Sequence, residues 1–356
     1  MKIFEEMEKR GHEELIFSYI DDVDLKLMIG IHDTTLGRTL GGLRMKNYIN
    51  EENAISEVLK LSEIQTYQCA AADIDSGGST VLAIGNPKSD KTESYFRAIG
   101  RLIESLKGRV YIFPDLGTDS ADFKYIQRET DYTIFKNRIK DNQKISAEIT
   151  ANGVYWGIKA CAKFKFGTSS LSGLTFSIQG LGKVGKQIVD FLKSEEDVHI
   201  IVTDLAYDNI KEVNDKYPDI EVVKPEEILE KKVDCFVPCA SGFIINEKNI
   251  DSLKCKIIAG AAYNIFTDES LIKKIHEKDI LYAPDFIIAA GDSFLVDDEL
   301  KLSDVVKAKE DTQIIYNVML NILNSAKIKN ITPYEHAIEL AIDRYEKIDK
   351  IKNILC

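Results

Sequence analysis

The sequence predicts an α/β protein with two domains. Short apolar runs of strand length alternate with helical patterns along most of the chain, an arrangement typical of sheets covered by helices. At 356 residues the chain is long enough for two hydrophobic cores. We expect one domain at residues 1–140, completed by a C-terminal helix at 331–356, and a second domain at 141–330.

A glycine-rich turn marks the second domain. Gly180, Gly182 and Gly185 lie in GLGKVG, between an apolar run and a helical pattern. In this pattern the first glycine allows a tight turn, the second lets the backbone approach a pyrophosphate, and the third lets helix and strand pack closely. Asp204 ends the next strand, where a carboxylate accepts ribose hydroxyls and repels a 2′-phosphate. The pattern predicts a Rossmann-type, doubly wound domain that binds NAD; a glycine turn in another α/β unit is the alternative.

Further cofactor-binding residues are expected around this turn. Lys183 and Val184 open the helix, and the stretches 238–242 and 259–264 follow later strands. If the carboxyl ends of those strands face the cofactor, both stretches contact it. The candidates in them are Cys239, Ala240, Ala261 and Asn264.

Composition excludes several classes of partner. The net charge of −12 and the pI of about 5.1 would repel a nucleic-acid backbone. No apolar run approaches the roughly 18 residues of a membrane span, and the N-terminus is too charged for a signal peptide. Six cysteines without a CxxC pair and five histidines without ligand spacing indicate no metal site. We expect a cytoplasmic protein that binds a small molecule.

The remaining elements follow from periodicity and turn residues. Gly41 and Gly42 fall in an expected glycine-rich loop at 36–45, which either shapes a binding surface or only punctuates a turn. The polar stretch 119–145 is expected to contain the hinge. Helices are expected at 1–10, 51–72, 93–106, 150–166, 297–327 as one long helix, and 332–351. Strands are expected at 14–20, 25–32, 79–84, 109–113, 174–179, 199–203, 220–223, 235–237, 256–258 and 281–283.

The order of motifs resembles one enzyme family. The motifs are LGGLRM (40–45), TYQCAAA (66–72), GGSTVLAIGNP (77–87), DLGT (115–118), TANGVYWGIKA (150–160), QGLGKVG (179–185), PCASG (238–242), IIAGAAYN (257–264) and YAPDFI (282–287). In this order they are similar to the glutamate/leucine/phenylalanine/valine dehydrogenase superfamily, and most like leucine dehydrogenase. The similarity covers nearly the whole chain.

The resemblance implies an N-terminal substrate and oligomerisation domain, an NAD domain, and a cleft between them. Such enzymes oxidise an L-amino acid to an imine, and water then releases the 2-oxo acid and ammonia. The resemblance also implies that this chain forms a homo-oligomer, either a dimer or an octamer. The resemblance also makes Thr150 a cofactor-binding residue.

The catalytic residues depart from the family pattern. Asp115 matches the catalytic aspartate, but Gln68 and Thr80 stand where the family has a carboxylate-binding lysine and a lysine that handles the proton of water. Asp292 replaces a glycine. Losing a general acid or base lowers a rate by roughly 10²- to 10⁴-fold, so ordinary deamination should be very slow. The resemblance thus gives Asp115 as the catalytic residue, and Gly41, Gly42, Gln68, Thr80 and Asp292 as substrate-binding residues.

Three hypotheses remain open from the sequence. The chain is an NAD-dependent oxidoreductase that acts on a C–N bond of an amine, an imine or an amino-acid derivative. Alternatively, it is an inactive NAD-binding pseudoenzyme that serves as a regulator or oligomer partner. In the third hypothesis, a non-redox enzyme uses Asp115 as a base.

Overall fold

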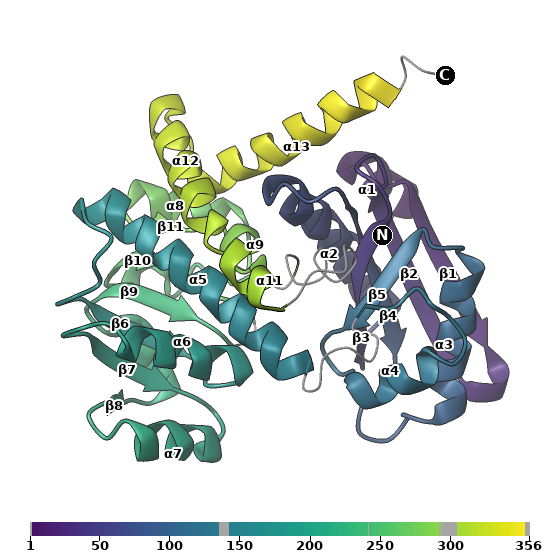
Figure 1. The fold of residues 1–356 in the computed structure, drawn as a ribbon, viewed down its shortest axis with the longest axis horizontal. Coiled ribbons are helices and arrows are strands. Elements are labelled where there is room, and N and C mark those ends of the chain that lie inside the picture. Colours follow the sequence, from purple (N-terminus) through teal and green to yellow (C-terminus); the bar gives the residue numbers. More distant parts are fainter. Residues whose placement is uncertain (1, 135–141, 241, 292, 294–304, 353–356) are drawn as a thin grey trace. The chain divides into compact units, whose positions relative to one another are not determined.

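The chain divides into two compact units. The structure is a computed structural model that describes residues 2–134, 142–240, 242–291, 293 and 305–352. Unit 1 comprises Met1–Gln143 and Leu340–Cys356, and unit 2 comprises Lys144–Glu339. Figure 1 labels the elements of both units.

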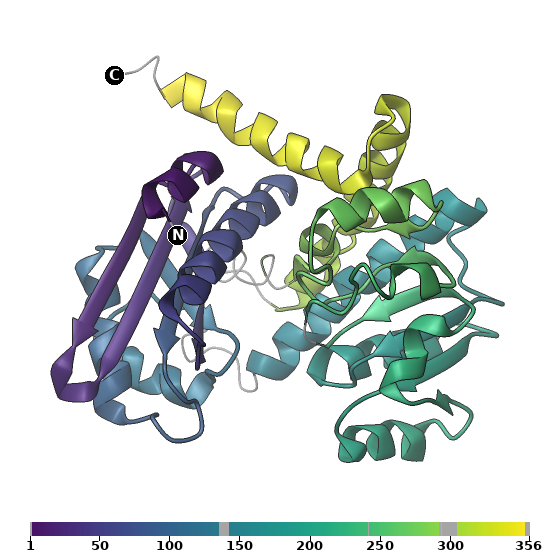
Figure 2. The same cartoon turned by 180° about the vertical axis from the view of Figure 1, so that it is seen from behind.

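Unit 1 contains a mixed sheet of five strands in the order β1-β2-β4-β3-β5. β1 and β2 form an antiparallel hairpin, which Figure 2 shows in purple, and β2 is also antiparallel to β4. β3 runs parallel to both β4 and β5. The strands are β1 (Glu14–Ile20), β2 (Leu25–Asp33), β3 (Thr39–Lys46), β4 (Gly77–Ile84) and β5 (Val110–Pro114).

Helices cover both faces of this sheet. Because side chains alternate along a strand, Val81 and Ala83 face the core formed with α3 and α4, whereas Leu82 packs against α2 on the other face. The face covered by α2 is the one that matters for the candidate site. The helices are α1 (Ile3–Arg10), α2 (Glu51–Ala71), α3 (Glu93–Ser105) and α4 (Ser120–Ile126).

The expected loop at 36–45 is wrong, because residues 39–46 form β3 in the interior of the sheet. Gly41 and Gly42 are therefore strand residues. A Cβ atom on Gly41 would lie 2.6 Å from the carbonyl oxygen of Ser79. The glycine here serves a close approach between neighbouring strands rather than a turn.

Unit 2 contains a six-stranded sheet in the order β11-β10-β9-β6-β7-β8, and every pair is parallel. Figure 1 shows α5 and α6 on one side of the sheet, and Figure 2 shows α8 on the other. The predicted doubly wound sheet is confirmed. The strands are β6 (Thr175–Gln179), β7 (His199–Thr203), β8 (Glu221–Val222), β9 (Val233–Pro238), β10 (Cys255–Ile258) and β11 (Leu281–Tyr282), and the helices are α5 (Asn142–Phe166), α6 (Lys183–Lys193), α7 (Tyr207–Lys216), α8 (Ser270–Glu277) and α9 (Asp285–Ile288).

The single helix expected at 297–327 is also wrong within the described residues. α11 (Val305–Asp311) ends before α12 (Ile314–Lys329) begins. Thr312 lies in the break, where its hydroxyl donates to the carbonyl of Lys309 (2.6 Å) and accepts from Asn152 of α5 (2.6 Å). A side chain that bonds to the backbone and to another helix competes with helix continuation.

The C-terminal helix α13 (Pro333–Lys352) supplies residues to both units. In unit 1, the guanidinium of Arg344 donates to the carbonyls of Ile74 (2.9 Å) and Ala70 (3.2 Å) and pairs with Asp75 (2.7 Å). These contacts tie α13 to the C-terminal end of α2 and to the turn that follows it. Within the described part of the chain, no helix is long and apolar enough to cross a membrane.

Candidate functional site

The glycine turn of unit 2 has the geometry of a phosphate cradle. Gly180 follows β6 with φ of +97°, a conformation that side chains disfavour. A Cβ atom on Gly185 would lie 2.0 Å from the carbonyl oxygen of Gly180, so only glycine fits there. A Cβ atom on Gly182 would meet no atom within 4 Å, and no side chain caps α6 at this residue. The start of α6 thus has room beside Gly182 for an anion, as a phosphate-binding helix end requires.

Asp204 joins this turn to the end of β7. Its Oδ2 accepts a hydrogen bond from the amide of Leu181 (2.6 Å), and its Oδ1 accepts from the amide of Ala206 (2.7 Å). A carboxylate has about four acceptor positions, so it can still accept from ribose hydroxyls. Asp204 thus supports the glycine turn as well as being the candidate ribose ligand.

The turn lies at the switch point of the sheet. The chain places β7 and β8 on one side of β6 and β9, β10 and β11 on the other, and ligands of such sheets bind at the carboxyl ends near this reversal. The amide of Cys239 donates to the carbonyl of Gln179 (2.7 Å), and a Cβ atom on Gly180 would lie 2.8 Å from the nitrogen of Ala240. Cys239 and Ala240 are therefore beside the cradle.

Burial raises the pKa of the Cys239 thiol to about 12. The thiol is therefore protonated at neutral pH, and a thiolate nucleophile at this position is not expected.

The other predicted cofactor residues lie in unit 2 at several places. Ala261 and Asn264 follow β10, and the amide of Asn264, a residue with φ of +55°, donates to Asp285 (3.0 Å). Lys183 and Val184 begin α6, and Thr150 lies half-buried on α5. Their roles as cofactor ligands stay predictions.

Unit 1 brings Asp115 and Gly42 together. Asp115 follows β5. On the neighbouring strand β3, Gly42 pairs with Phe113 of β5. The amide of Leu116 donates to Oδ1 of Asp115 (2.7 Å), and a Cβ atom on Gly42 would lie 2.6 Å from its Oδ2. Because Gly42 has no side chain, the carboxylate of Asp115 can occupy the space where a Cβ atom would otherwise lie.

Arg44 is the residue of this site that the sequence analysis missed. Its Nε lies 2.6 Å from Oδ2 of Asp115, and its Nη1 lies 3.1 Å from Glu57 of α2. Burial disfavours the charge on Arg44, but these two carboxylates more than offset it and raise the pKa. Lys46 also pairs with Glu57. The charges around Asp115 therefore compensate one another. Residues 42 and 44 share one face of β3, a signal that was hidden because a loop was expected at 36–45.

Gln68 and Thr80 belong to elements that pack against each other. A Cβ atom on Gly78 would lie 2.3 Å from the nitrogen of Thr66, so β4 approaches the backbone of α2 at this point. Thr80 is two residues further along β4 and lies on the same face of the sheet. Both side chains are buried, with 2% of Gln68 and 4% of Thr80 exposed. Asp292 lies outside the described residues.

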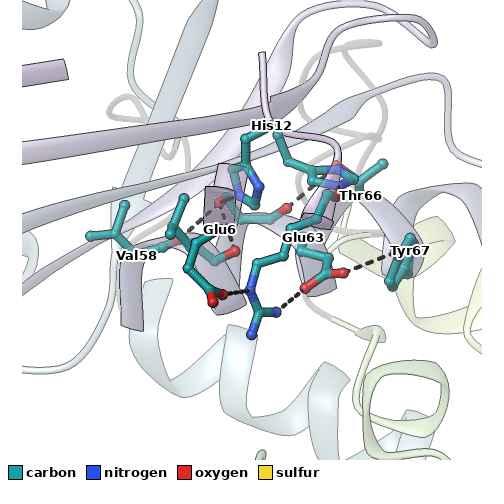
Figure 3. A network of polar contacts seen from close by, with 10 residues as sticks. Glu6, His12, Val58, Glu63, Thr66 and Tyr67 are labelled. Carbon is teal, nitrogen blue, oxygen red and sulfur yellow. Dashed lines mark hydrogen bonds and ion pairs between the residues drawn. The ribbon is translucent and has the colours of Figure 1, made fainter. Parts of the chain in front are cut away.

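Two buried histidines bond to side chains of α2, and Figure 3 labels one of them, His12. His32 Nδ1 lies 2.9 Å from the hydroxyl of Thr66, and that hydroxyl accepts from the amide of Gly78 (2.9 Å). His32 Nε2 donates to the carbonyl of Arg10 (2.8 Å), so Nδ1 is the acceptor of the Thr66 proton. His12 Nε2 lies 2.9 Å from the hydroxyl of Ser62.

An ion pair closes the same network on the outer side of α2. Arg10 pairs with Glu63, and the hydroxyl of Tyr67 donates to Glu63 (3.1 Å). The network therefore fixes α2 just before Gln68. The sequence did not indicate it, because its residues come from three separate segments.

The parallel sheet, the cradle at its switch point and the acid after β7 are the features of a Rossmann-type, dinucleotide-binding class of protein. The family follows from residues 143–344, which match the model of glutamate/leucine/phenylalanine/valine dehydrogenase, and residues 20–132, which match the dimerisation domain of Glu/Leu/Phe/Val dehydrogenases. The chain belongs to this family of amino acid dehydrogenases. Its members depend on NAD or NADP, and NAD fits the cradle described here.

Individual relatives agree with this assignment and confirm the resemblance to leucine dehydrogenase. The chain is 39% identical to a leucine dehydrogenase from Thermoactinomyces intermedius, over 99% of this chain and 96% of the relative. It is 42% identical to a phenylalanine dehydrogenase from Lysinibacillus sphaericus, over 92% and 87%. The crystal structure of L-tryptophan dehydrogenase from Nostoc punctiforme superposes with a TM-score of 0.82 at 36% identity, covering 98% of this chain and 99% of that one.

Proposed function

We propose that the protein is an NAD-dependent oxidoreductase that acts on a C–N bond, in an amine, an imine or an amino-acid derivative whose carboxylate is masked. The observation that carries this proposal is the neutral, buried pair Gln68 and Thr80, at the two positions where the resemblance places lysines. Neither side chain titrates near neutral pH, so they orient a substrate rather than bind a carboxylate by charge or move a proton.

The charges near Asp115 support the same conclusion. Arg44 is held by Asp115 and Glu57, and Lys46 is held by Glu57. A substrate carboxylate would have to compete with these carboxylates for the cations. A neutral or cationic group meets no such competition.

NAD supplies the hydride acceptor when it is bound, and the residues of this chain do the rest. Gly180, Gly182 and the first amides of α6 would hold the pyrophosphate, and Asp204 would hold the adenosine ribose. Asp115 is the group that would exchange a proton with the reacting nitrogen. Its ion pair with Arg44 and its bond from the Leu116 amide hold the carboxylate in one orientation.

The same ion pair gives the pseudoenzyme hypothesis its support. A carboxylate that pairs with Arg44 and accepts from the Leu116 amide also has a purely structural explanation. In that case the protein keeps NAD and serves as a regulator or as a subunit of an oligomer. The match to a dimerisation domain supports a homo-oligomer in either case. A cytoplasmic location stays a prediction.

Calorimetric titration with NAD, NADH, NADP and NADPH tests the shared part of the two hypotheses. We expect NAD or NADH to bind more tightly than the phosphorylated forms, and no binding by any of the four would contradict both. Absorbance assays with amines, amino-acid amides and imines then separate them. We expect turnover of one such class, no detectable oxidation of leucine, and loss of turnover in Asp115→Asn; unchanged turnover in that variant would remove Asp115 as the acid-base group.

A further inference from the structure

One residue beside the cofactor edge of unit 2 has a backbone conformation that its side chain disfavours. Phe243 has a φ of +60°, in the left-handed region, where a bulky side chain is a rare outlier. Among the non-glycine residues with a positive φ in the described part of the chain, Phe243 is the only apolar one, and the others are Asp, Asn or Lys. Asp and Asn tolerate this conformation because their short polar side chains bond locally, which phenylalanine cannot do.

Solvent exposure is a second unfavourable feature at the same position. Phe243 is 62% exposed, although an aromatic ring is stabilised by burial. Glycine would avoid both the backbone strain and the exposed apolar surface. Residues held in sparsely populated backbone conformations cluster at ligand sites. The two features together therefore indicate a ring that becomes covered when a ligand binds.

The surrounding backbone holds Phe243 in place. Its amide donates to the carbonyl of Asn264 (2.7 Å), and a Cβ atom on Gly242 would lie 2.6 Å from that carbonyl oxygen. Two residues later, the amide of Ile245 donates to the carbonyl of Ile265 (2.9 Å), and Ile245 is fully buried. The loop after β9 is thus fastened to the loop after β10, which fixes the backbone of Phe243 near the carboxyl ends of both strands.

The strand order assigns this edge to one half of a dinucleotide. The order β8-β7-β6-β9-β10-β11 is that of two mononucleotide-binding halves that meet between β6 and β9. Asp204, which follows β7, is the candidate ligand of the adenosine ribose, so the adenosine half belongs to β6, β7 and β8. The nicotinamide half therefore belongs to β9 and β10, whose loops hold Phe243. Three residues along the chain separate Phe243 from Ala240 beside the cradle, a span of at most about 11 Å.

We propose that Phe243 packs its ring against the nicotinamide ring of NAD. This inference rests on the proposed NAD-dependent function and adds to it a contact residue on the reactive half of the cofactor. An aromatic face is complementary to the flat nicotinamide ring, whereas it offers no hydrogen bond to phosphates or ribose hydroxyls. Binding covers the exposed ring, and this contact offsets the backbone strain.

The test is calorimetric titration of the full chain with NADH and with ADP-ribose, which lacks the nicotinamide ring. We expect Phe243→Gly to bind NADH about tenfold more weakly and to bind ADP-ribose as the parent does. Urea unfolding separates this effect from misfolding. Because glycine accommodates a positive φ, the unfolding midpoint of this variant should not fall. Phe243→Tyr keeps an aromatic ring and should retain the affinity of the parent for NADH.

Asn330→Gly is the matched control. Asn330 has a φ of +55°, is exposed and ends α12 in the same unit, so this variant changes a left-handed residue outside the candidate cofactor site. Its NADH affinity should equal that of the parent. Unchanged NADH affinity in Phe243→Gly, an equal loss for NADH and ADP-ribose, or an equal loss in Asn330→Gly would each overturn this inference alone. A parent chain that binds neither ligand would overturn the proposed function, and this inference with it.

Discussion

The side chain of Asp115 occupies the space that a Cβ atom on Gly42 would need, since that atom would lie 2.6 Å from Oδ2 and 2.8 Å from Cβ of the aspartate. The two residues come from neighbouring strands, and each limits what the other can be. Arg44, two residues beyond Gly42, then holds the carboxylate at 2.6 Å.

Gly42→Ala should displace Asp115 from Arg44. We expect a loss of about 1–3 kcal/mol in the free energy of unfolding from overpacking, lower turnover of any substrate found, and unchanged NAD affinity, because the cradle is in unit 2. Urea unfolding and calorimetry measure these effects. In the double variant with Asp115→Gly most of the stability should return; the same loss in both backgrounds would show that the clash is not the cause.

Gly182→Ala and Gly185→Ala should separate cofactor binding from folding. The added methyl group at 182 meets no protein atom within 4 Å, so stability should change little while NAD affinity falls about tenfold through blocked phosphate approach. The methyl group at 185 lies 2.0 Å from the Gly180 carbonyl, so this variant should lose stability first, by about 1–3 kcal/mol. Urea unfolding and NAD titration of both variants measure the two effects. Unchanged NAD affinity in Gly182→Ala would contradict the assignment of this turn as the phosphate cradle.

Asp204→Asn should narrow the preference for NAD over NADP. The change removes the negative charge that repels a 2′-phosphate and keeps one acceptor oxygen for the backbone amides. We expect the ratio of the NADPH and NADH dissociation constants to fall about tenfold, by calorimetry. Asp208→Asn, which neutralises an exposed acid on α7, is the control. A similar shift in both variants would point to a general field effect.

The double variant Gln68→Lys/Thr80→Lys should gain NAD-dependent oxidation of leucine or phenylalanine. Both positions are buried, and burial lowers the pKa of a lysine toward the range of a useful base. Each lysine alone should restore little, since the two act as a unit. The control is Gln65→Lys, which places the charge earlier on α2. A folded, NAD-binding double variant without this activity would show that more than the lysines has changed.

Lowering the pH should destabilise unit 1, because the buried histidines His12 and His32 have lowered pKa values. Burial and the nearby His32 lower the pKa of His12 to about 3, and burial also lowers that of His32. The unfolded chain therefore takes up protons first as pH falls below about 6.5. The free energy of unfolding should drop by up to roughly 1.4 kcal/mol per pH unit for each histidine, continuing toward pH 3 for His12.

Amide hydrogen exchange of α2 between pH 7 and 5 is the suitable measurement, because the single tryptophan, Trp156, lies in unit 2. His12→Asn keeps a donor for Ser62 and should flatten the pH dependence. His199→Asn, at an exposed position, should not. An equal slope in the parent and in His12→Asn would exclude His12 as its source.

The doubly wound sheet was predictable because its signals are local. Gly180 to Asp204 fit one continuous strand, turn, helix and strand pattern, and the structure has each element there. β3 was not predictable in the same way. Paired glycines at 41 and 42 are usual in turns, and only the approach of Ser79 and Asp115 from neighbouring strands explains them in a strand.

The contacts that support the site in unit 1 could not be predicted from the sequence either. The ion pair of Arg44 with Asp115, and that of Arg10 with Glu63, join residues 71 and 53 positions apart. Periodicity carries no information on such pairs. The alternation that places Arg44 on the face of Gly42 applies only once residues 39–46 are known to form β3.

The contacts of Arg344 set an order of events during synthesis. The carbonyls of Ala70 and Ile74 that this residue bonds leave the ribosome early, while Arg344 emerges only after all of unit 2. Domains generally fold as they emerge, so the end of α2, just beyond Gln68, waits without its final partner while the other unit completes its sheet. The contacts next to Gln68 are therefore among the last to form in the nascent chain.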